Sequence, residues 1–360
     1  AMNTSKHYFP LKDLPASLSA SVEFLDVAVN TRISWYKMLL NFIFSRNPYN
    51  AVRFISPDFE NKLITLLRER LFDVIQLEGL YLAPYIPSIR ANSRALITMR
   101  AHNVEHEIWL RTALQCKGLR KHYLMNLAKR IRRMELLYLN AYDALIPITQ
   151  RDADIFVGMA CKLPVHVAPT GISAASLKPE RDKIEFPSLF HIGALDWAPN
   201  QEGIFWFLEH IWDHLQKANP NLKLYIAGRN APDKISKIRK KNVVFLGEVE
   251  DAYQFMNSKA IMIVPLLSGS GMRIKIIEGM ALGKTIISTP IGAEGIQCRH
   301  GENIIIADTP QKFTEEIQSL LNNFDKFDTV GKRAMEFVHK TYDNTSIMSD
   351  LLEFYKMHLK

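Results

Sequence analysis

The sequence has few cysteines, no long apolar run and no glycine before Gly79. Its three cysteines, Cys116, Cys161 and Cys298, are too few and too scattered for a disulfide framework or a metal-binding knuckle, and they fit a reducing compartment. The apolar stretch Met38–Phe44 contains one asparagine and is far too short to span a bilayer. No signal peptide is evident either, so the sequence predicts a cytoplasmic protein.

The composition is that of an ordinary globular protein, with 48% hydrophobic and 23% charged residues. A chain of 360 residues is long enough for two domains, each with its own core. The net charge of +8 is unevenly spread, because residues 1–180 carry 23 Lys and Arg against 15 Asp and Glu, whereas residues 181–360 carry 22 of each. A basic half is compatible with nucleic acid, an anionic bilayer or an anionic substrate.

The most specific pattern runs from Ile261 to Gly295. An apolar run ends at Pro265, a glycine loop follows, and apolar residues then recur at helical spacing at Ile274, Ile277, Met280 and Ala281. A second apolar run, Thr285–Ser288, comes two residues after Gly283. This order predicts a strand–helix–strand crossover in a parallel sheet, whose strand ends are where such sheets bind ligands.

The loop and the start of this helix have the chemistry of a phosphate site. A helix beginning just after Gly271 would direct unpaired N–H groups and the positive end of its dipole at the loop. Arg273 and Lys275 add two cations, and Glu278 lies in the same helix. We therefore expect a site for a diphosphate. The alternative is a glycine-capped packing turn in some other doubly wound sheet.

The segment GSGMRIKIIEGMALGKTIIST resembles the donor-site signature of family-4 glycosyltransferases, and the match continues to Gly292, Glu294 and Gly295. The resemblance implies the GT-B fold, retaining glycosyl transfer and a nucleotide diphosphosugar as donor. It implies that Glu278 holds the donor ribose. The sugar-side carboxylate of the family's Glu pair is replaced here by Ser270.

The resemblance also implies the other donor contacts. Many members have an Arg and a Lys after the first strand of this domain, but GALDWAPN, residues 193–200, has neither, so Arg273 and Lys275 would take over that charge neutralisation without a metal. Backbone groups of 246–249 would contact the base. The predicted donor-binding residues are Gly193, Arg229, Gly247, Glu248, Val249, Ser268, Gly269, Ser270, Gly271, Met272 and Glu278.

In the N-terminal half, RAHNVEHEIW (100–109) resembles the place where many family members keep a histidine beside the donor sugar, which corresponds to His102. The predicted catalytic residues are thus His102, Arg273 and Lys275, and the alternative for His102 is that it only braces its loop. His102, Glu105 and His106 also spell H-x-x-E-H, a zinc peptidase motif. We reject it because the motif directly follows an apparent strand and no third ligand stands out.

Two segments have open interpretations. We expect Arg32–Phe44 to be a buried core helix, and the alternative is a segment near the acceptor or the membrane surface. The long helical stretch Arg111–Leu139 would place Leu119, Tyr123, Leu127, Ile131 and Met134 inward. Its basic face, Arg120 to Arg133, would contact either anionic lipid or only solvent. Nucleic acid is not expected, since aromatic residues do not alternate with the cations.

The first strands are predicted at Glu23–Val29 and Ala51–Ile55. Because N-terminal domains of the GT-B fold usually open with a strand and a glycine loop, we expect the first strand–helix unit to be absent from this chain.

The sequence thus predicts two Rossmann-like domains facing a cleft: residues 1–175, residues 186–342, and a helix over 343–360 that returns to the first domain. We expect a retaining transferase that moves a sugar from a nucleotide diphosphosugar to a glycan or lipid-linked acceptor in cell-envelope polysaccharide synthesis. It would be cytoplasmic, with peripheral contact to the membrane. A sugar-nucleotide 2-epimerase of the same fold and an inactive donor-binding module remain as alternatives.

Overall fold

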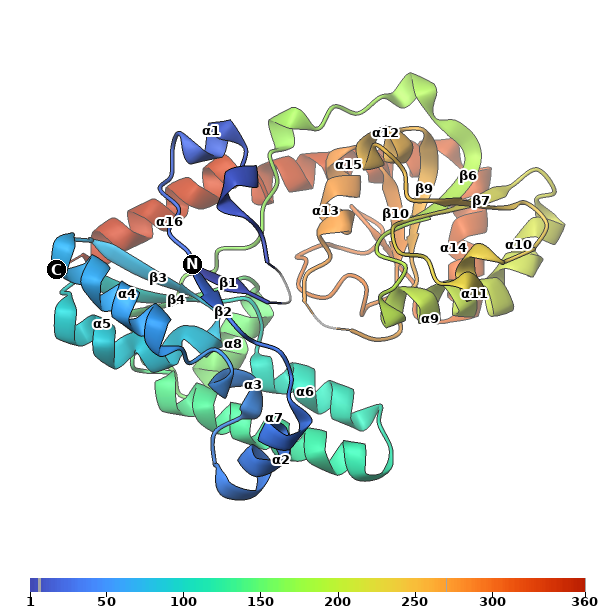
Figure 1. Ribbon diagram of the computed structural model, residues 1–360. Coiled ribbons are helices and arrows are strands. Elements are labelled where there is room, and N and C mark those ends of the chain that lie inside the picture. The colour runs from blue at the N-terminus through green and yellow to red at the C-terminus, as the bar shows by residue number, and fades with distance from the viewer. Residues whose placement is uncertain (6–7, 270, 360) are drawn as a thin grey trace. The chain divides into compact units, whose positions relative to one another are not determined.

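A computed structural model describes residues 1–5, 8–269 and 271–359 (Figure 1). Ser270, one of the predicted donor contacts, lies outside the described residues. The chain divides into two compact units, Ala1–Val167 with Glu353–Lys360, and Ala168–Leu352. The first unit ends at Val167, whereas the sequence predicts that the first domain ends at residue 175.

The second unit contains a six-stranded parallel sheet. Its strands are β6 (Glu185–Ile192), β7 (Lys223–Ala227), β8 (Val243–Gly247), β9 (Lys259–Val264), β10 (Thr285–Ser288) and β11 (Ile305–Ile306). Their spatial order is β11-β10-β9-β6-β7-β8. Read from the β8 edge and counted along the chain, this is 3-2-1-4-5-6, the doubly wound arrangement in which the strand order reverses between β6 and β9. The two strands predicted from the apolar run before Pro265 and from Thr285–Ser288 are confirmed as β9 and β10.

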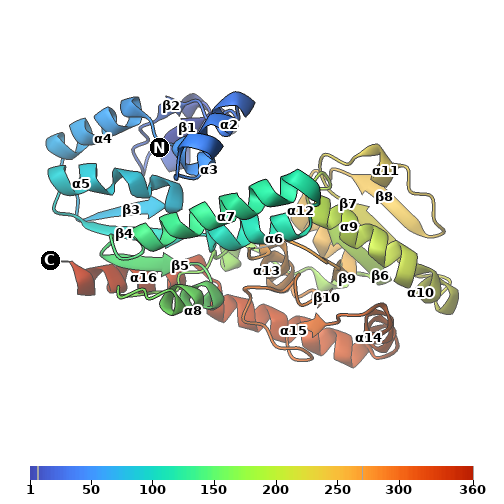
Figure 2. The same cartoon turned by 90° about the horizontal axis from the view of Figure 1, so that it is seen from below.

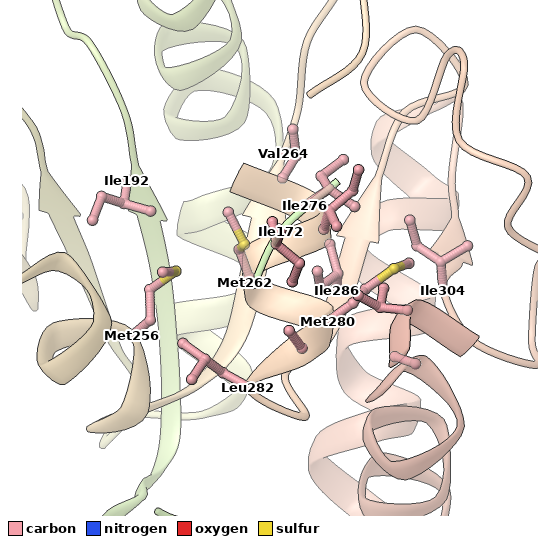
Figure 3. Packing of buried hydrophobic residues seen from close by; sticks show 14 of the residues in the cluster. Ile172, Ile192, Met256, Met262, Val264, Ile276, Met280, Leu282, Ile286 and Ile304 are labelled. Atoms are coloured by element: carbon pink, nitrogen blue, oxygen red, sulfur yellow. The ribbon is translucent and has the colours of Figure 1, made fainter. Parts of the chain in front are cut away.

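Helices cover both faces of this sheet, which explains why its strands are almost continuously apolar. Ile261 and Ile263 of β9 belong to one buried cluster, whereas Met262 and Val264 belong to the other. Figure 3 shows part of the second cluster, with Met262 and Ile286 of the sheet close to Ile276 and Met280 of α13. The helices of the unit are α9 (Ala198–Phe207), α10 (Asp213–Ala218), α11 (Asp233–Ser236), α12 (Ala252–Asn257), α13 (Ile274–Ala281), α14 (Pro310–Asn322), α15 (Phe324–Thr341) and α16 (Asn344–His358).

The first unit has two small parallel sheets. One contains β3 (Val74–Glu78), β4 (Leu96–Ala101) and β5 (Ala144–Pro147), in that order, and the other pairs β1 (Met2–Thr4) with β2 (Val27–Val29). The prediction of a strand at Ala51–Ile55 is wrong, because this segment begins inside a helix. Strand β1 was not predicted, since its three residues acquire their partner 25 positions later, at Met2↔Val27, and local pattern does not reveal such pairing.

The helices of the first unit surround these sheets. They are α1 (Ala16–Ser19), α2 (Trp35–Phe44), α3 (Tyr49–Val52), α4 (Pro57–Glu69), α5 (Ile86–Asn92), α6 (Glu105–Leu114), α7 (Gly118–Tyr138) and α8 (Gln150–Gly158). Helices α6 and α7 lie side by side (Figure 2). Helix α16 begins in the second unit, and its last residues belong to the first.

The expectation that Arg32–Phe44 is a buried core helix is wrong. None of the residues of α2 is buried, and the side chains of Trp35 and Phe44 are 73% and 82% exposed. The helix is instead attached at its two ends. The Tyr49 hydroxyl bonds to the backbone of Ser34, and Arg130 of α7 donates to the carbonyls of residues 41 and 42. An apolar pattern predicts that a helix packs against another surface, but it does not show that this surface belongs to the same chain.

The long helix predicted over Arg111–Leu139 is two helices, because the chain turns after Leu114 and Gly118 adopts a left-handed conformation with φ of +60°. Leu119, which was predicted to point inward, is 90% exposed at the first turn of α7. Leu127, Ile131 and Met134 are buried as predicted. Within the described part of the chain, no helix is both long and apolar enough to cross a bilayer.

Two glycines in helices allow the effect of close packing on stability to be separated from the effect of low helix propensity. A Cβ at Gly331 of α15 would lie 2.4 Å from the Gly283 carbonyl oxygen, whereas a Cβ at Gly158 of α8 would meet nothing within 4 Å. Gly331→Ala should therefore lower the unfolding free energy by about 1–3 kcal/mol through overpacking. Gly158→Ala should be neutral or raise it by up to about 1 kcal/mol. Urea unfolding of both variants measures this, and equal effects would contradict the close contact.

Candidate functional site

The loops after β6, β7 and β8 are joined by backbone hydrogen bonds at the carboxyl end of the sheet. The Gly193 N–H donates to Ala227 O at 3.2 Å, the Leu195 N–H to Arg229 O at 2.9 Å, and the Gly228 N–H to Gly247 O at 2.7 Å. A Cβ on Gly228 would lie 1.7 Å from the Gly193 carbonyl oxygen, so only glycine fits there. The predicted residues Gly193, Arg229 and Gly247 thus belong to one connected set of loops.

Lys275 links the start of α13 to this set across the point where the strand order reverses. Its Nζ donates to Ile192 O at 3.0 Å and to Asn200 Oδ1 at 3.1 Å. Burial, with a smaller contribution from the charge of Arg273, lowers the pKa of Lys275 from 10.5 to about 7. Desolvation of this cation opposes folding, and the cost is largest below pH 7, where the lysine is charged in both the folded and the unfolded chain.

Two neighbours of Lys275 are also buried and polar. Asn200 is fixed by a hydrogen bond from its Nδ2 to Ala194 O at 2.8 Å. His191, the penultimate residue of β6, faces the Ile263 carbonyl at 3.2 Å. Burial, reinforced by the charge of Lys275, lowers the pKa of His191, which is therefore neutral at pH 7. Lys275 is consequently the cation of this group at neutral and lower pH.

Arg273 occupies the N-cap position of α13, which begins at Ile274 rather than directly after Gly271. Its guanidinium is 5.1 Å from the ring centroid of Trp197, and Nη1 donates to the Gly271 carbonyl. Only 7% of the residue is exposed. Arg273 therefore contacts both Trp197 and the glycine loop, and it adds a buried positive charge next to that loop.

The remaining predicted donor contacts that the structure describes lie in α13, in the loop before it and after the ends of β7 and β8. Glu278 Oε1 accepts a hydrogen bond from the Tyr253 hydroxyl at 2.9 Å, and burial together with this carboxylate raises the pKa of Tyr253 to about 12. The Ser268 hydroxyl donates to Glu202 of α9 at 2.6 Å. Met272 and Val249 pack against the buried cluster of Figure 3, Gly269 and Gly271 are partly exposed, and Glu248 and Arg229 are exposed.

In the first unit, His102 lies in the loop after β4 and pairs with a carboxylate at the end of β3. Its Nε2 is 2.6 Å from Glu78 Oε2. Glu78 also accepts from Gln76, and the Tyr355 hydroxyl of α16 donates to Gln76. Burial raises the pKa of Glu78, but the hydrogen bonds from His102 and Gln76 and the charge of Arg100 outweigh it, so its pKa lies below the ordinary value. Glu78 is therefore an anion that orients the imidazole.

The H-x-x-E-H residues are divided among separate partners. His106 bonds to Glu135 of α7, which also accepts the Glu105 N–H at 2.8 Å. The Glu105 carboxylate accepts from Tyr81 at 3.0 Å, and burial raises its pKa. Among the described residues, no group of three or more histidines, cysteines or carboxylates is placed to bind a metal ion. These pairs attach α6 to α7 and fix the loop that carries His102.

Sequence reasoning missed several of these partners. Trp197 and Asn200 lie in the GALDWAPN loop. The prediction considered only that this loop lacks Arg and Lys, and it assigned no role to these two residues. Glu78 ends the strand that neighbours the one preceding His102, and this adjacency was a usable signal, because parallel strand ends meet at one edge. Tyr253 gave no signal, since its contact with Glu278 depends on how α12 packs.

Both a family model and a curated relative match part of the chain. The family model described as "Glycosyl transferases group 1" matches residues 186–323. A curated relative, the "uncharacterized 44.6 kDa protein in cps region" of Klebsiella pneumoniae, is 28% identical over 176 residues, which are 46% of this chain and 45% of the relative. The chain thus matches less than half the length of this relative.

Two solved structures resemble nearly the whole chain. Sucrose-phosphate synthase from Thermosynechococcus elongatus has a TM-score of 0.66 at 14% identity, with 93% of this chain and 84% of that chain covered. Anabaena Alr3699/HepE in complex with UDP-glucose has a TM-score of 0.63 at 15% identity, with 92% of each chain covered. The predicted GT-B fold is therefore confirmed, and residues 186–323 are similar to the glycosyl transferases group 1 family.

Proposed function

We propose that this protein is a retaining glycosyltransferase that moves a sugar from a nucleotide diphosphosugar to a glycan or lipid-linked acceptor in cell-envelope polysaccharide synthesis. The observation that carries the proposal is Lys275, an ammonium held between the end of β6 and Asn200 at the reversal of strand order. The structural similarity to HepE with UDP-glucose and the cps-region relative support the donor class and the pathway class.

The chemistry follows from where charge develops. As the glycosidic bond breaks, the sugar acquires oxocarbenium character and negative charge collects on the departing phosphate. Lys275, the positive end of α13 and the charge of Arg273 beneath the glycine loop would stabilise that phosphate. Glu278 would hold the ribose while Tyr253 orients its carboxylate. Two cations and a helix terminus supply the neutralisation, so the proposal includes no metal.

His102 would act near the donor sugar. Because ionised Glu78 only accepts hydrogen bonds, the imidazole Nε2 carries the proton that faces it. Nδ1 is then the atom left to contact a sugar hydroxyl or phosphate oxygen, and it donates only when the ring is protonated. Glu78 fixes the tautomer and the orientation of the ring. We assign Glu78 the role of a positioning residue and His102 that of the group it positions.

For the acceptor, the proposal favours a lipid-linked glycan. Helix α7 exposes cations at Arg120, Lys129, Arg132 and Arg133, and such a face would contribute about 1 kcal/mol per cation to contact with an anionic membrane. The side chain of Arg130, in contrast, donates hydrogen bonds to backbone carbonyls of α2 and so attaches α2 to α7. Peripheral contact of a cytoplasmic enzyme with the membrane is therefore part of the proposed function.

Calorimetric titration of the purified chain with UDP-glucose and with GDP-mannose tests the donor assignment. We expect binding of one donor, and competition by the matching nucleoside diphosphate. Absence of binding by both would overturn the proposal. Proton NMR of each mixture without acceptor distinguishes the alternative enzyme, because a 2-epimerase would convert the donor by itself.

The pKa of Lys275 makes donor binding depend on pH. Its charged form binds a diphosphate, and in the free protein that form is depleted as the pH rises through about 7. Affinity for the donor should therefore fall roughly tenfold between pH 6.5 and 8.5, while proton uptake accompanies binding. Esterified phosphates of the donor do not titrate in this range. Lys275→Met should bind weakly at every pH, and a pH slope equal to that of the parent would disprove the assignment.

Arg273→Ala should weaken nucleoside diphosphate binding by about tenfold or more, because it removes a charge and releases the Gly271 loop from Trp197. Arg333→Ala provides the matched control, since Arg333 is an exposed arginine of α15 in the same unit and is not among the predicted donor contacts. Calorimetry at low and high salt separates the two causes. An unchanged affinity of Arg273→Ala would remove Arg273 from the phosphate site.

Glu78→Gln should lower kcat by about tenfold with donor affinity within twofold, because a neutral amide can donate as well as accept and no longer fixes the imidazole proton on Nε2. Glu78→Asp keeps the carboxylate and should restore part of the activity. Loss of folded protein in Glu78→Gln, or a loss of donor affinity as large as the loss of kcat, would show a purely structural role.

A further inference from the structure

A cavity of about 300 Å³ lies in the first unit between the segment 46–55 and α7. Three arginines line it, Arg46, Arg130 and Arg133, and apolar side chains such as Val52, Ile55 and Leu137 line the rest. It is separate from the donor-site loops, which all belong to the second unit. An apolar chamber with several guanidinium groups has the chemistry to hold an anion that carries a hydrocarbon portion.

None of the described residues that line the cavity is Asp or Glu. Residues 27–57 contain no Asp or Glu, and neither do residues 112–134. Guanidinium groups match phosphate oxygens in pairs of parallel hydrogen bonds, whereas chloride or a single carboxylate would use Arg46 and Arg133 less completely. The charge pattern thus selects a phosphate group.

The exposed helix α2 shares Arg130 with this cavity. Arg130 Nη2 donates to Phe42 O at 2.7 Å, and its guanidinium lies 5.3 Å from the Phe42 ring centroid. The arginine therefore fixes the C-terminal end of α2 against α7. Large apolar side chains of α2 remain exposed, namely Trp35, Tyr36, Leu39, Leu40, Phe42, Ile43 and Phe44. Such a helix, rich in aromatics and next to cations, is suited to the boundary between headgroups and acyl chains.

We propose that the cavity binds the phosphate headgroup of a single bilayer lipid, with the exposed face of α2 immersed at the level of the acyl chains. The proposal goes beyond diffuse attraction of the basic α7 face, because it names a saturable site with defined ligating arginines. It does not depend on the donor chemistry of the second unit, so it can fail while glycosyl transfer stands, and the reverse. An anionic bilayer, rather than a second protein chain, is the occupant because the region is cationic as well as apolar.

The test uses the purified full chain and water-soluble probes that separate the two parts of the site. Dihexanoyl phosphatidic acid should bind with one-to-one stoichiometry and at least about tenfold more tightly than inorganic phosphate, which lacks the hydrocarbon, or dihexanoyl phosphatidylcholine, whose headgroup is zwitterionic. Equal binding of inorganic phosphate would overturn the proposal, because the apolar lining would then contribute nothing.

Matched variants locate the site. Arg133→Gln and Arg46→Gln should each weaken binding of the lipid phosphate about fivefold or more, whereas Arg120→Gln, an exposed arginine of α7 that does not line the cavity, should change it less than twofold. Leu137→Ser should weaken the lipid phosphate but not inorganic phosphate, and Leu137 is 71% exposed, so folding does not depend on it. Equal losses for Arg120→Gln and Arg133→Gln would show diffuse attraction only and reject the site.

Vesicles test the role of α2. Sedimentation with phosphatidylglycerol vesicles should carry the chain down, and the double variant Leu39→Ser/Ile43→Ser should reduce the bound fraction at least about fivefold, with the far-UV spectrum unchanged. Phosphatidylcholine vesicles should bind weakly. If the double variant binds vesicles as the parent does, or if the parent self-associates through α2 and the variant is monomeric, the assignment of α2 to the bilayer is overturned.

Discussion

The donor half of the structure is organised around the ammonium of Lys275. It satisfies the last carbonyl of β6 and the side chain of Asn200, and it does so from the first turn of a helix that follows β9. Strands β6 and β9 are adjacent in the sheet, but the chain continues from them toward opposite edges of the sheet. The connecting segments therefore leave a space at the carboxyl ends of these two strands. A cation placed there without a carboxylate partner is costly unless an anion arrives, and this is the property of a binding site.

The packing beneath that site explains its precision. Helix α13 can lie close to the sheet because Gly279 faces Met262, where a Cβ would be 3.0 Å from the sulfur. Its apolar face, Ile276, Ile277 and Met280, is fully buried. Movement of the first turn of α13 would therefore disturb a close-packed core. The packing of that core thus restricts the positions of the site residues on this turn. The stacking of Arg273 on Trp197 extends this order into the glycine loop.

In the first unit, paired carboxylates and exposed apolar side chains lie in two different regions. Near His102, three carboxylates are engaged: Glu78 orients the histidine, Glu105 accepts from Tyr81, and Glu135 joins α6 to α7. Residues 27–57, which include α2, contain no Asp or Glu, and large apolar side chains of α2 are exposed. The region near His102 is thus suited to hold a reactive side chain in one orientation. The region of α2 is suited to bind a partner that is both apolar and anionic.

Local residue patterns are enough to predict the parallel sheet of the second unit, because continuous apolar runs such as Ile261–Val264 alternate with helical spacing and end at glycine loops. They also place the diphosphate chemistry near Arg273 and Lys275, since two cations at a helix start behind a glycine loop favour an anion as the ligand. That Arg273 is buried and Lys275 partly buried, and what they contact, follows from tertiary packing, because Asn200 and Trp197 reach them from a different strand end. The pairing of β1 with β2, the partnership of His102 with Glu78 and the exposure of α2 are likewise long-range outcomes. A local pattern carries no information about which surface a segment finally meets, because that surface is assembled from residues far away along the chain.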